Sequence, residues 1–388
     1  MSRTPLAWKN LVHEPRRLLL ASAGVGFAAV LMFTQNGFRH ALLDSPVQLI
    51  EWMECDLVAT STARYMLPVN QRFARSLLRR AESDPDVSAA EALLIERLMA
   101  RVRVAGERAR PIRVVSVPDP PGWLTIPGLK EQRLSLQPPG TALIDRKTRA
   151  RYGFQFDHRG SPLPQTVELA EKRIRIVGSV TIGTDFANEG SLLIRESEFA
   201  RYFPLRGSGS PLGVVDVGMF RIKRGADPDQ VAERLTNLAP CIWNVVRKDE
   251  LKQKERKFWS EQTPVGAIFF IGTVMGFVVG VIICYQILYT SLQDAMPEFA
   301  TLKAMGYPNR YFVGVVVRQS VFLSWFGFVP AVLVALALFW MLESYSGLPM
   351  RLTFTRAITV LALTTSMCLI SGLLALRNLV RADPASLF

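Results

Sequence analysis

Four long stretches without a charged side chain most constrain how this chain of 388 residues can fold. They run from Leu18 to Phe38, from Gln262 to Gln293, from Gln319 to Leu342 and from Ala357 to Leu376. As helices that rise about 1.5 Å per residue, each is long enough to cross a hydrocarbon layer of about 30 Å. The sequence therefore predicts a membrane protein with four spanning helices.

A polar interval, residues 39–261, separates the first two spans and is long enough to bury a core of its own. We therefore expect an α-helical four-span bundle with a large α+β domain inserted between helices 1 and 2. The four spans are expected at residues 18–38, 262–290, 318–342 and 357–376. An amphipathic N-terminus (1–17) precedes them and a tail (377–388) follows them. The segments between the spans are the inserted domain with a stalk helix (39–261), a connecting loop (291–317) and an outer loop (343–356).

The first stretch could instead be a cleaved signal peptide, because Arg16 and Arg17 precede it. It is longer than the apolar core of a signal peptide, and residues 34–38 offer no small-x-small cleavage site. We expect a retained helix. Before it, Trp8, Leu11 and Val12 share one helical face, which favours a short interfacial helix over a frayed terminus.

The positive-inside rule orients the four spans. Basic residues precede the first span, lie between the second and third, and follow the fourth: Arg3, Lys9, Arg16, Arg17, Lys303, Arg310, Arg377 and Arg381. All of these positions fall on one side, although Arg351 and Arg356 lie on the other. We predict a membrane protein with both termini in the cytoplasm and the inserted domain on the opposite side of the membrane.

The inserted domain has the patterns of mixed helices and strands. Strands are predicted at 56–60, 112–117, 173–180, 191–194, 214–222 and 242–246, and helices at 70–83 and 227–238. The proline- and glycine-rich interval 118–164 predicts no definite structure. Asp249 can cap a charged helix that leads to Gln262. Since the window from Gln262 would be about 48 Å long as one helix, we expect a stalk that projects from the membrane.

Two patterns on the membrane side indicate contact surfaces. Gly272, Gly276 and Gly280 recur on one helix face, which favours close helix association over a chance abundance of glycine. After the second span, Pro297, Glu298, Lys303 and Gly306 have the order expected for the start and end of a two-turn helix. Such a helix offers a docking surface for a soluble partner, and the alternative is a tight turn without one.

The cysteines allow two outcomes in the inserted domain. Cys55 and Cys241 could form a disulfide in an oxidising compartment or remain two unpaired thiols. Cys284 and Cys368 lie inside spans, where a thiol behaves as a small apolar group.

Enzyme chemistry is not indicated. The histidines His13, His40 and His158 lie in three different regions, and the chain has no CxxC, HExxH or GxxxxGK[ST] motif. We predict no catalytic residue, no metal site and no cofactor in this chain, so any ATP must be bound elsewhere. The net charge of +13 is spread over the domain and the membrane flanks, which favours contact with lipid headgroups over nucleic-acid binding.

Several segments resemble DevC-type permeases, which belong with the MacB, FtsX and LolE group of ABC transporter subunits. These segments are Tyr285–Tyr289, Glu298–Tyr307, Met367–Gly372 and Ala382–Phe388, with further likeness at Gly183–Gly190 and Thr263–Gly266. The resemblance implies a MacB-like periplasmic domain and a homodimer bound to two copies of a separate ABC ATP-binding subunit, which would hold ATP and magnesium. The coupling helix of that group maps onto Glu298, Ala300, Thr301, Leu302, Lys303, Ala304, Met305 and Gly306.

The same resemblance implies efflux by mechanotransmission, in which the long second helix relays movement to the periplasmic domain. A membrane-fusion adaptor and a TolC-like outer-membrane duct would complete the machine, and the cargo would be a glycolipid or another amphiphile. The alternatives are an FtsX-like regulator of a periplasmic hydrolase and a LolE-like lipoprotein-releasing permease.

Overall fold

The computed structural model describes residues 15–157, 160–207, 209–348, 350 and 352–381. The chain divides into two compact units. The helical unit contains the described residues up to His40, Pro264–Met341 and those from Met350 onward, and the sheet unit contains Ala41–Thr263 and a short segment that begins at Leu342. The helix predicted around Trp8 lies outside the described residues.

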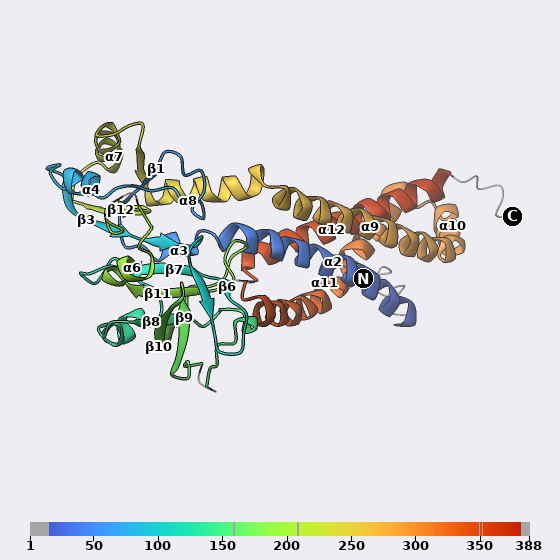
Figure 1. Ribbon diagram of the computed structural model, residues 1–388. Coiled ribbons are helices and arrows are strands. Elements are labelled where there is room, and N and C mark those ends of the chain that lie inside the picture. The colour runs from blue at the N-terminus through green and yellow to red at the C-terminus, as the bar shows by residue number, and fades with distance from the viewer. Residues whose placement is uncertain (1–14, 158–159, 208, 349, 351, 382–388) are drawn as a thin grey trace. The chain divides into compact units, whose positions relative to one another are not determined.

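The helical unit consists of five helices (Figure 1). They are α2 (Pro15–Asp44), α9 (Pro264–Asp294), α10 (Met296–Ala304), α11 (Asn309–Ser346) and α12 (Phe354–Arg381). Four of them contain a segment long and apolar enough to cross a membrane: Leu18–Asp44, Pro264–Asp294, Arg310–Tyr345 and Phe354–Asn378. The four predicted spans are thus present as helices.

Glycine allows two helices of this unit to pack backbone against backbone. A Cβ built on Gly26 of α2 would lie 3.2 Å from the carbonyl oxygen of Gly327 in α11. A larger residue at either position would push the two helices apart, because backbone atoms cannot move aside as a side chain can. α11 also continues through Pro330, which removes one backbone donor from its interior.

The sheet unit contains three sheets. The first has the order β14-β1-β13-β3, the second the order β4-β7-β11-β8-β10-β9-β5-β6, and the third pairs β12 with β2. The strands are β1 (Leu57–Ser61), β2 (Phe73–Ala74), β3 (Val87–Leu93), β4 (Ile95–Glu96), β5 (Arg101–Arg103), β6 (Arg110–Pro111), β7 (Arg113–Val117), β8 (Thr141–Asp145), β9 (Gln165–Leu169), β10 (Lys172–Val180), β11 (Ser191–Arg195), β12 (Val214–Val215), β13 (Val217–Ile222) and β14 (Trp243–Arg247).

Short helices precede, connect and follow these strands. They are α3 (Gln48–Glu51), α4 (Ser76–Ala81), α5 (Leu129–Gln132), α6 (Glu196–Tyr202), α7 (Pro228–Asn237) and α8 (Lys248–Lys257), with the 3₁₀ turns η1 (Arg133–Leu136) and η2 (Ala150–Tyr152) and the π-helical turn η3 (Phe258–Gln262). The interval 118–164, for which the sequence predicted nothing definite, therefore holds α5, η1, β8 and η2.

Both faces of the central strands are buried, which explains their continuous apolar runs. Alternate residues of a strand point to opposite faces. Leu57 and Ala59 of β1 join one apolar core, while Val58 between them joins a second. Leu193 in β11 likewise faces the second core, and its neighbour Leu192 faces the first. The α+β architecture predicted for the inserted domain is thus observed, with two cores.

Two local predictions were wrong. The helix predicted at 70–83 is confined to α4, because Phe73 and Ala74 pair with β12 as strand β2. Asp249 does not cap α8, since Arg247 occupies the N-cap position and Asp249 lies in the first turn. The apolar spacing that favoured the longer helix reflects burial of Phe73 in the core, which a strand satisfies equally well.

Candidate functional site

The predicted docking helix is present as α10, with a well-formed end. Glu298 lies in its first turn and Lys303 in its last, where each charge complements the helix dipole. The Tyr307 N–H donates to the Leu302 carbonyl at 3.2 Å, and the Gly306 N–H donates to the Lys303 carbonyl at 3.0 Å. Gly306 has φ +92°, the left-handed conformation that this ending requires.

The structure brings the candidate docking residues together on one small exposed surface. Leu302 is half-buried. The other candidate residues whose side chains are described are exposed: Glu298, Ala300, Thr301, Lys303, Ala304, Met305 and Gly306. Met305 is 66% exposed, which is unusual for a large apolar side chain next to a helix end. This surface is therefore available to a partner.

The glycine face of α9 is occupied within the chain. Added Cβ atoms would meet the Gln35 side chain at Gly272, the Met32 and Leu31 side chains at Gly276, and Ala28 and Met367 at Gly280. These three glycines thus lie against α2 and α12. Exposed apolar side chains occupy other positions along α9, namely Ile268, Ile271, Met275, Val278 and Ile282.

The path from the sheet unit into α9 is not one continuous α-helix. α8 ends at Lys257, and one π-helical turn, Phe258–Gln262, follows it. Thr263 then has φ −108° and ψ 141°, an extended conformation, and α9 begins at Pro264. A residue before proline is driven away from the helical conformation by the proline ring. The expected stalk is therefore interrupted at Thr263.

Glu255 of α8 forms a hydrogen bond with a loop near the start of the sheet unit. Its Oε2 accepts from the Leu67 N–H at 2.9 Å, and its Oε1 accepts from Trp259 Nε1 at 3.0 Å. The residue is 2% exposed, and burial raises the pKa of its carboxyl above the ordinary value. A buried carboxyl thus links the stalk helix α8 to the loop that contains Leu67.

A buried ionic cluster lies beside this fastening. Asp216, between β12 and β13, accepts from Arg64 Nη2 at 3.1 Å, from Arg72 Nε at 3.2 Å and from Arg206 Nη2. It also accepts from the Ile95 N–H at 2.8 Å. Burial lowers the pKa of Arg64 to about 10 and that of Arg206 to about 9, so both remain charged at neutral pH. No sequence motif indicated this cluster, because its members are far apart along the chain.

Cys55 and Cys241 do not form a disulfide. In the antiparallel pair of β1 and β14, Leu57 lies opposite Arg247 and Ser61 lies opposite Trp243. Cys55 precedes the first end of this pair, and Cys241 precedes the other end, so the two thiols are separated by the length of the strands. At about 3.3 Å per residue this separation far exceeds the reach of a disulfide.

The described residues contain no group of three or more His, Cys, Asp or Glu side chains that could hold a metal ion. His13 and His158 lie outside the described residues. His40 lies in α2, where its Nδ1 is 2.9 Å from the Asn36 carbonyl oxygen.

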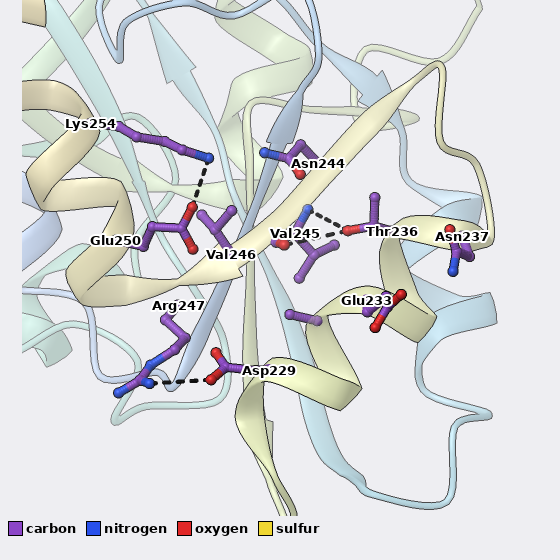
Figure 2. Close-up of a pocket in the computed structure, with 11 residues that line it drawn as sticks. Asp229, Glu233, Thr236, Asn237, Asn244, Val245, Val246, Arg247, Glu250 and Lys254 are labelled. Carbon is purple, nitrogen blue, oxygen red and sulfur yellow. Dashed lines mark hydrogen bonds and ion pairs between the residues drawn. The ribbon is translucent and has the colours of Figure 1, made fainter.

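A cleft of about 350 Å³ between α7, β14 and α8 is shown in Figure 2. Arg247 pairs with Asp229 there at 3.6 Å. The Thr236 hydroxyl accepts from the Val245 N–H at 3.1 Å and donates to its carbonyl at 3.3 Å. Since β14 is an outer strand, these bonds cover backbone groups that could otherwise pair with another chain. The cleft therefore protects a sheet edge.

Part of the chain is similar to a known protein family. Residues 266–384, from α9 to α12, match the family described as FtsX-like permease C-terminal. Curated protein sequences gave no match. The extracellular domain of the noncanonic ABC-type transporter YknZ from Gram-positive bacteria aligns with a TM-score of 0.33 and 10% identity, over 50% of this chain and 98% of that one. The periplasmic region of MacB from Actinobacillus actinomycetemcomitans aligns with a TM-score of 0.34 and 12% identity. This alignment covers 53% of the present chain and 94% of the MacB region.

The family match includes the exposed α10 and three of the four candidate spans. With the four apolar helices, it identifies a membrane protein. Residues 266–384 are therefore similar to the C-terminal domain of FtsX-like permeases.

Proposed function

We propose that the chain is the permease subunit of a bacterial ABC exporter of the DevC type that works by mechanotransmission. A separate ATP-binding subunit hydrolyses ATP with magnesium in the cytoplasm and docks on α10. Its closure moves α10, and the movement passes through α9 and α8 to a periplasmic sheet unit. The functional unit is a homodimer with two ATP-binding subunits, a membrane-fusion adaptor and a TolC-like duct, and it exports an amphiphile such as a glycolipid.

The exposed surface of α10 is the observation that carries this proposal. A nine-residue helix whose described side chains are nearly all exposed gains little from packing on its own chain. It nevertheless carries an acidic residue in its first turn and a basic residue in its last turn, which both complement the helix dipole. Its C-terminal carbonyl groups also accept hydrogen bonds from Gly306 and Tyr307. A rigid, uncovered element of this kind favours recognition by a second protein, because little order has to be gained on binding.

Substitutions on α10 test the docking role in the complex purified with its ATP-binding subunit. Glu298→Lys reverses a charge, and Leu302→Glu places a charge on the half-buried side of the helix. Both should abolish permease-stimulated ATP hydrolysis. Lys130→Glu, an exposed charge reversal on α5 of the sheet unit, should leave stimulation unchanged. Full stimulation in both α10 variants would refute docking at this helix.

Co-purification separates export from the two other roles of this permease group. An adaptor and an outer-membrane duct that purify with the complex support export. A periplasmic hydrolase in their place supports an FtsX-like regulator, and a lipoprotein chaperone supports a LolE-like releasing permease.

A further inference from the structure

A second cavity of the sheet unit, of about 360 Å³, lies between the loop that follows β1 and the stalk helix α8. It shares Asn244, Val246 and Lys254 with the cleft of Figure 2 but is otherwise lined by different residues. Its volume falls within the range of small-molecule sites, which begins at about 300 Å³. Nothing in the proposed transport scheme uses it.

The cavity has an apolar floor and an aromatic side. Leu67, Val246 and Leu251 line it and are each less than 10% exposed, so their apolar surface is already shielded from bulk water. At the rim, the rings of Tyr65 and Phe258 lie 5.5 Å apart, and Tyr65 is 64% exposed. An apolar chain that entered here would itself leave water, which contributes about 0.8 kcal/mol per methylene group of the chain.

The charges around the cavity favour an anion. Three cationic side chains line it, Arg64, Lys254 and Lys257, together with the carboxyl of Glu255. Because Arg64 is already paired with the buried Asp216, the two lysines are the cations that a ligand can engage. Both oxygens of Glu255 already accept hydrogen bonds from the protein. Lys254 pairs with Glu250 at 3.0 Å and Lys257 pairs with Glu261 at 3.9 Å. All four side chains are about half exposed or more, so both pairs are weak and can be exchanged for a ligand.

Neutral polar groups in the lining complete the recognition surface. Ser61, Asn244 and Gln262 line the cavity, and their side chains make no hydrogen bond within the part of the chain that the structure describes. Hydroxyl and amide groups of this kind can donate to phosphate or carboxylate oxygens. They lie in the same cavity as the two lysines.

We propose that this cavity binds a small anionic amphiphile, with its acidic head between Lys254 and Lys257 and its apolar chain on Leu67, Val246 and Leu251. Because α8 and the π-helical turn form one wall, the occupant contacts the segment that leads into α9. The site does not depend on the proposed export function, since binding can be measured without a nucleotide or a partner protein.

The test uses the full chain in phosphatidylcholine nanodiscs, with empty nanodiscs as the blank and hexyl phosphate as the probe in a calorimetric titration. Hexyl phosphate should bind saturably and at least about tenfold more tightly than inorganic phosphate or hexanol, because it uses both parts of the site. Hexyltrimethylammonium, which has the same chain and the opposite charge, should not compete. Lack of saturable binding, or equal binding of the cation, would overturn the proposal.

Paired variants of α8 locate the binding. Lys254→Gln with Lys257→Gln should weaken hexyl phosphate about tenfold or more, and Ser61→Trp should block it by filling the cavity. The matched control, Lys252→Gln with Arg256→Gln, removes the same charge from the same helix at positions that do not line the cavity, and it should bind as the wild type does. Equal losses in both pairs would mean that only the net charge matters and would refute the site. Near-ultraviolet circular dichroism of each variant verifies that its fold is retained.

Discussion

The Leu67 backbone N–H donates to Glu255 Oε2 at 2.9 Å, so a loop that follows the first strand is tied to the helix at the end of the sheet unit. Arg64 in the same loop pairs with Asp216 at 3.1 Å, and Trp259 in the π-helical turn donates to Glu255 Oε1. A displacement of α8 therefore acts directly on a buried ionic cluster of the sheet unit.

The Glu255 carboxyl predicts a pH dependence of stability. Its pKa in the folded protein is raised, chiefly by burial, above its ordinary value of 4.5. Between these two values the native protein holds a proton that the unfolded chain releases, so native stability falls as the pH rises through this window. Glu255→Gln cannot lose that proton. We expect its unfolding midpoint, relative to that of the wild type, to rise as the pH is raised from 4.5.

Thermal unfolding followed by tryptophan fluorescence measures this difference. Glu255→Gln also loses one acceptor, which costs about 1–3 kcal/mol at every pH, so the slope is the diagnostic quantity and the offset is not. Glu250→Gln, an exposed substitution on the same helix, should show the slope of the wild type. If the unfolding midpoints of Glu255→Gln and the wild type changed with pH in the same way, the assigned role of this carboxyl would be contradicted.

Asp216 predicts a large loss of stability. Asp216→Ala leaves Arg64 and Arg206 with buried guanidinium groups that have lost their main partner. Removal of one partner from a buried ion pair costs about 3–5 kcal/mol. In a domain of this size we expect the unfolding midpoint to fall by about 10 °C or more. Asp229→Ala breaks an exposed pair with Arg247 and should change the midpoint little. Similar midpoints for both variants would exclude a central role for the cluster.

The surroundings of the α9 glycines predict which of them tolerate substitution by alanine. A Cβ on Gly280 would lie 2.9 Å from the Ala28 Cβ, a rigid neighbour, whereas the nearest atom to a Cβ on Gly276 is 3.5 Å away. Gly280→Ala should therefore destabilise the helical unit by about 1–3 kcal/mol through overpacking, and Gly276→Ala should be nearly neutral. Gly314→Ala, with no atom within 4 Å, is the control. The temperature at which half of each variant aggregates in detergent ranks the stability of the three variants. If Gly276→Ala were less stable than Gly280→Ala, the packing described for α9 would be contradicted.

A second ion pair joins the end of α11, which belongs to the sheet unit from Leu342 onward, to the rest of that unit. Lys147 Nζ lies 2.8 Å from Glu343 Oε1, with both side chains about one third exposed. Lys147→Glu and Glu343→Lys should each loosen the segment that begins at Leu342, and the double variant should restore it. The coupling energy is expected to be about 0.2–1 kcal/mol. Hydrogen exchange of residues 342–348 measures each state, and additive effects in the double variant would show that the pair does not interact.

The sequence predicted well whatever depends on local pattern. Uncharged windows of spanning length revealed all four helices, and runs such as the one around Val115 revealed buried strands, because burial on both faces requires apolar residues throughout. The end of α10 was predictable since Gly306 is the residue type that its backbone conformation favours. The break at Thr263 also had a local signal in Pro264, which the long apolar window concealed.

Features that depend on contacts between distant residues could not be predicted in this way. The Asp216 cluster joins residues as far apart as Arg64 and Arg206, and no spacing rule relates them. The short strand at Phe73 exists because β12 pairs with it. The choice between a Cys55–Cys241 bridge and two unpaired thiols stayed open in the sequence for the same reason: strand pairing, which sets the two thiols apart, is a property of the fold.

The central claim is that α10 and the sheet unit lie on opposite sides of the membrane, and thiol labelling of intact spheroplasts tests it most directly. Cys241 is exposed, whereas Cys284 and Cys368 are fully buried and burial raises the pKa of the Cys55 thiol to about 12. A membrane-impermeant maleimide should label native Cys241 in intact spheroplasts. In a Cys241→Ser background, Met305→Cys should react only after permeabilisation. Labelling of both thiols from the same side would contradict the entire account.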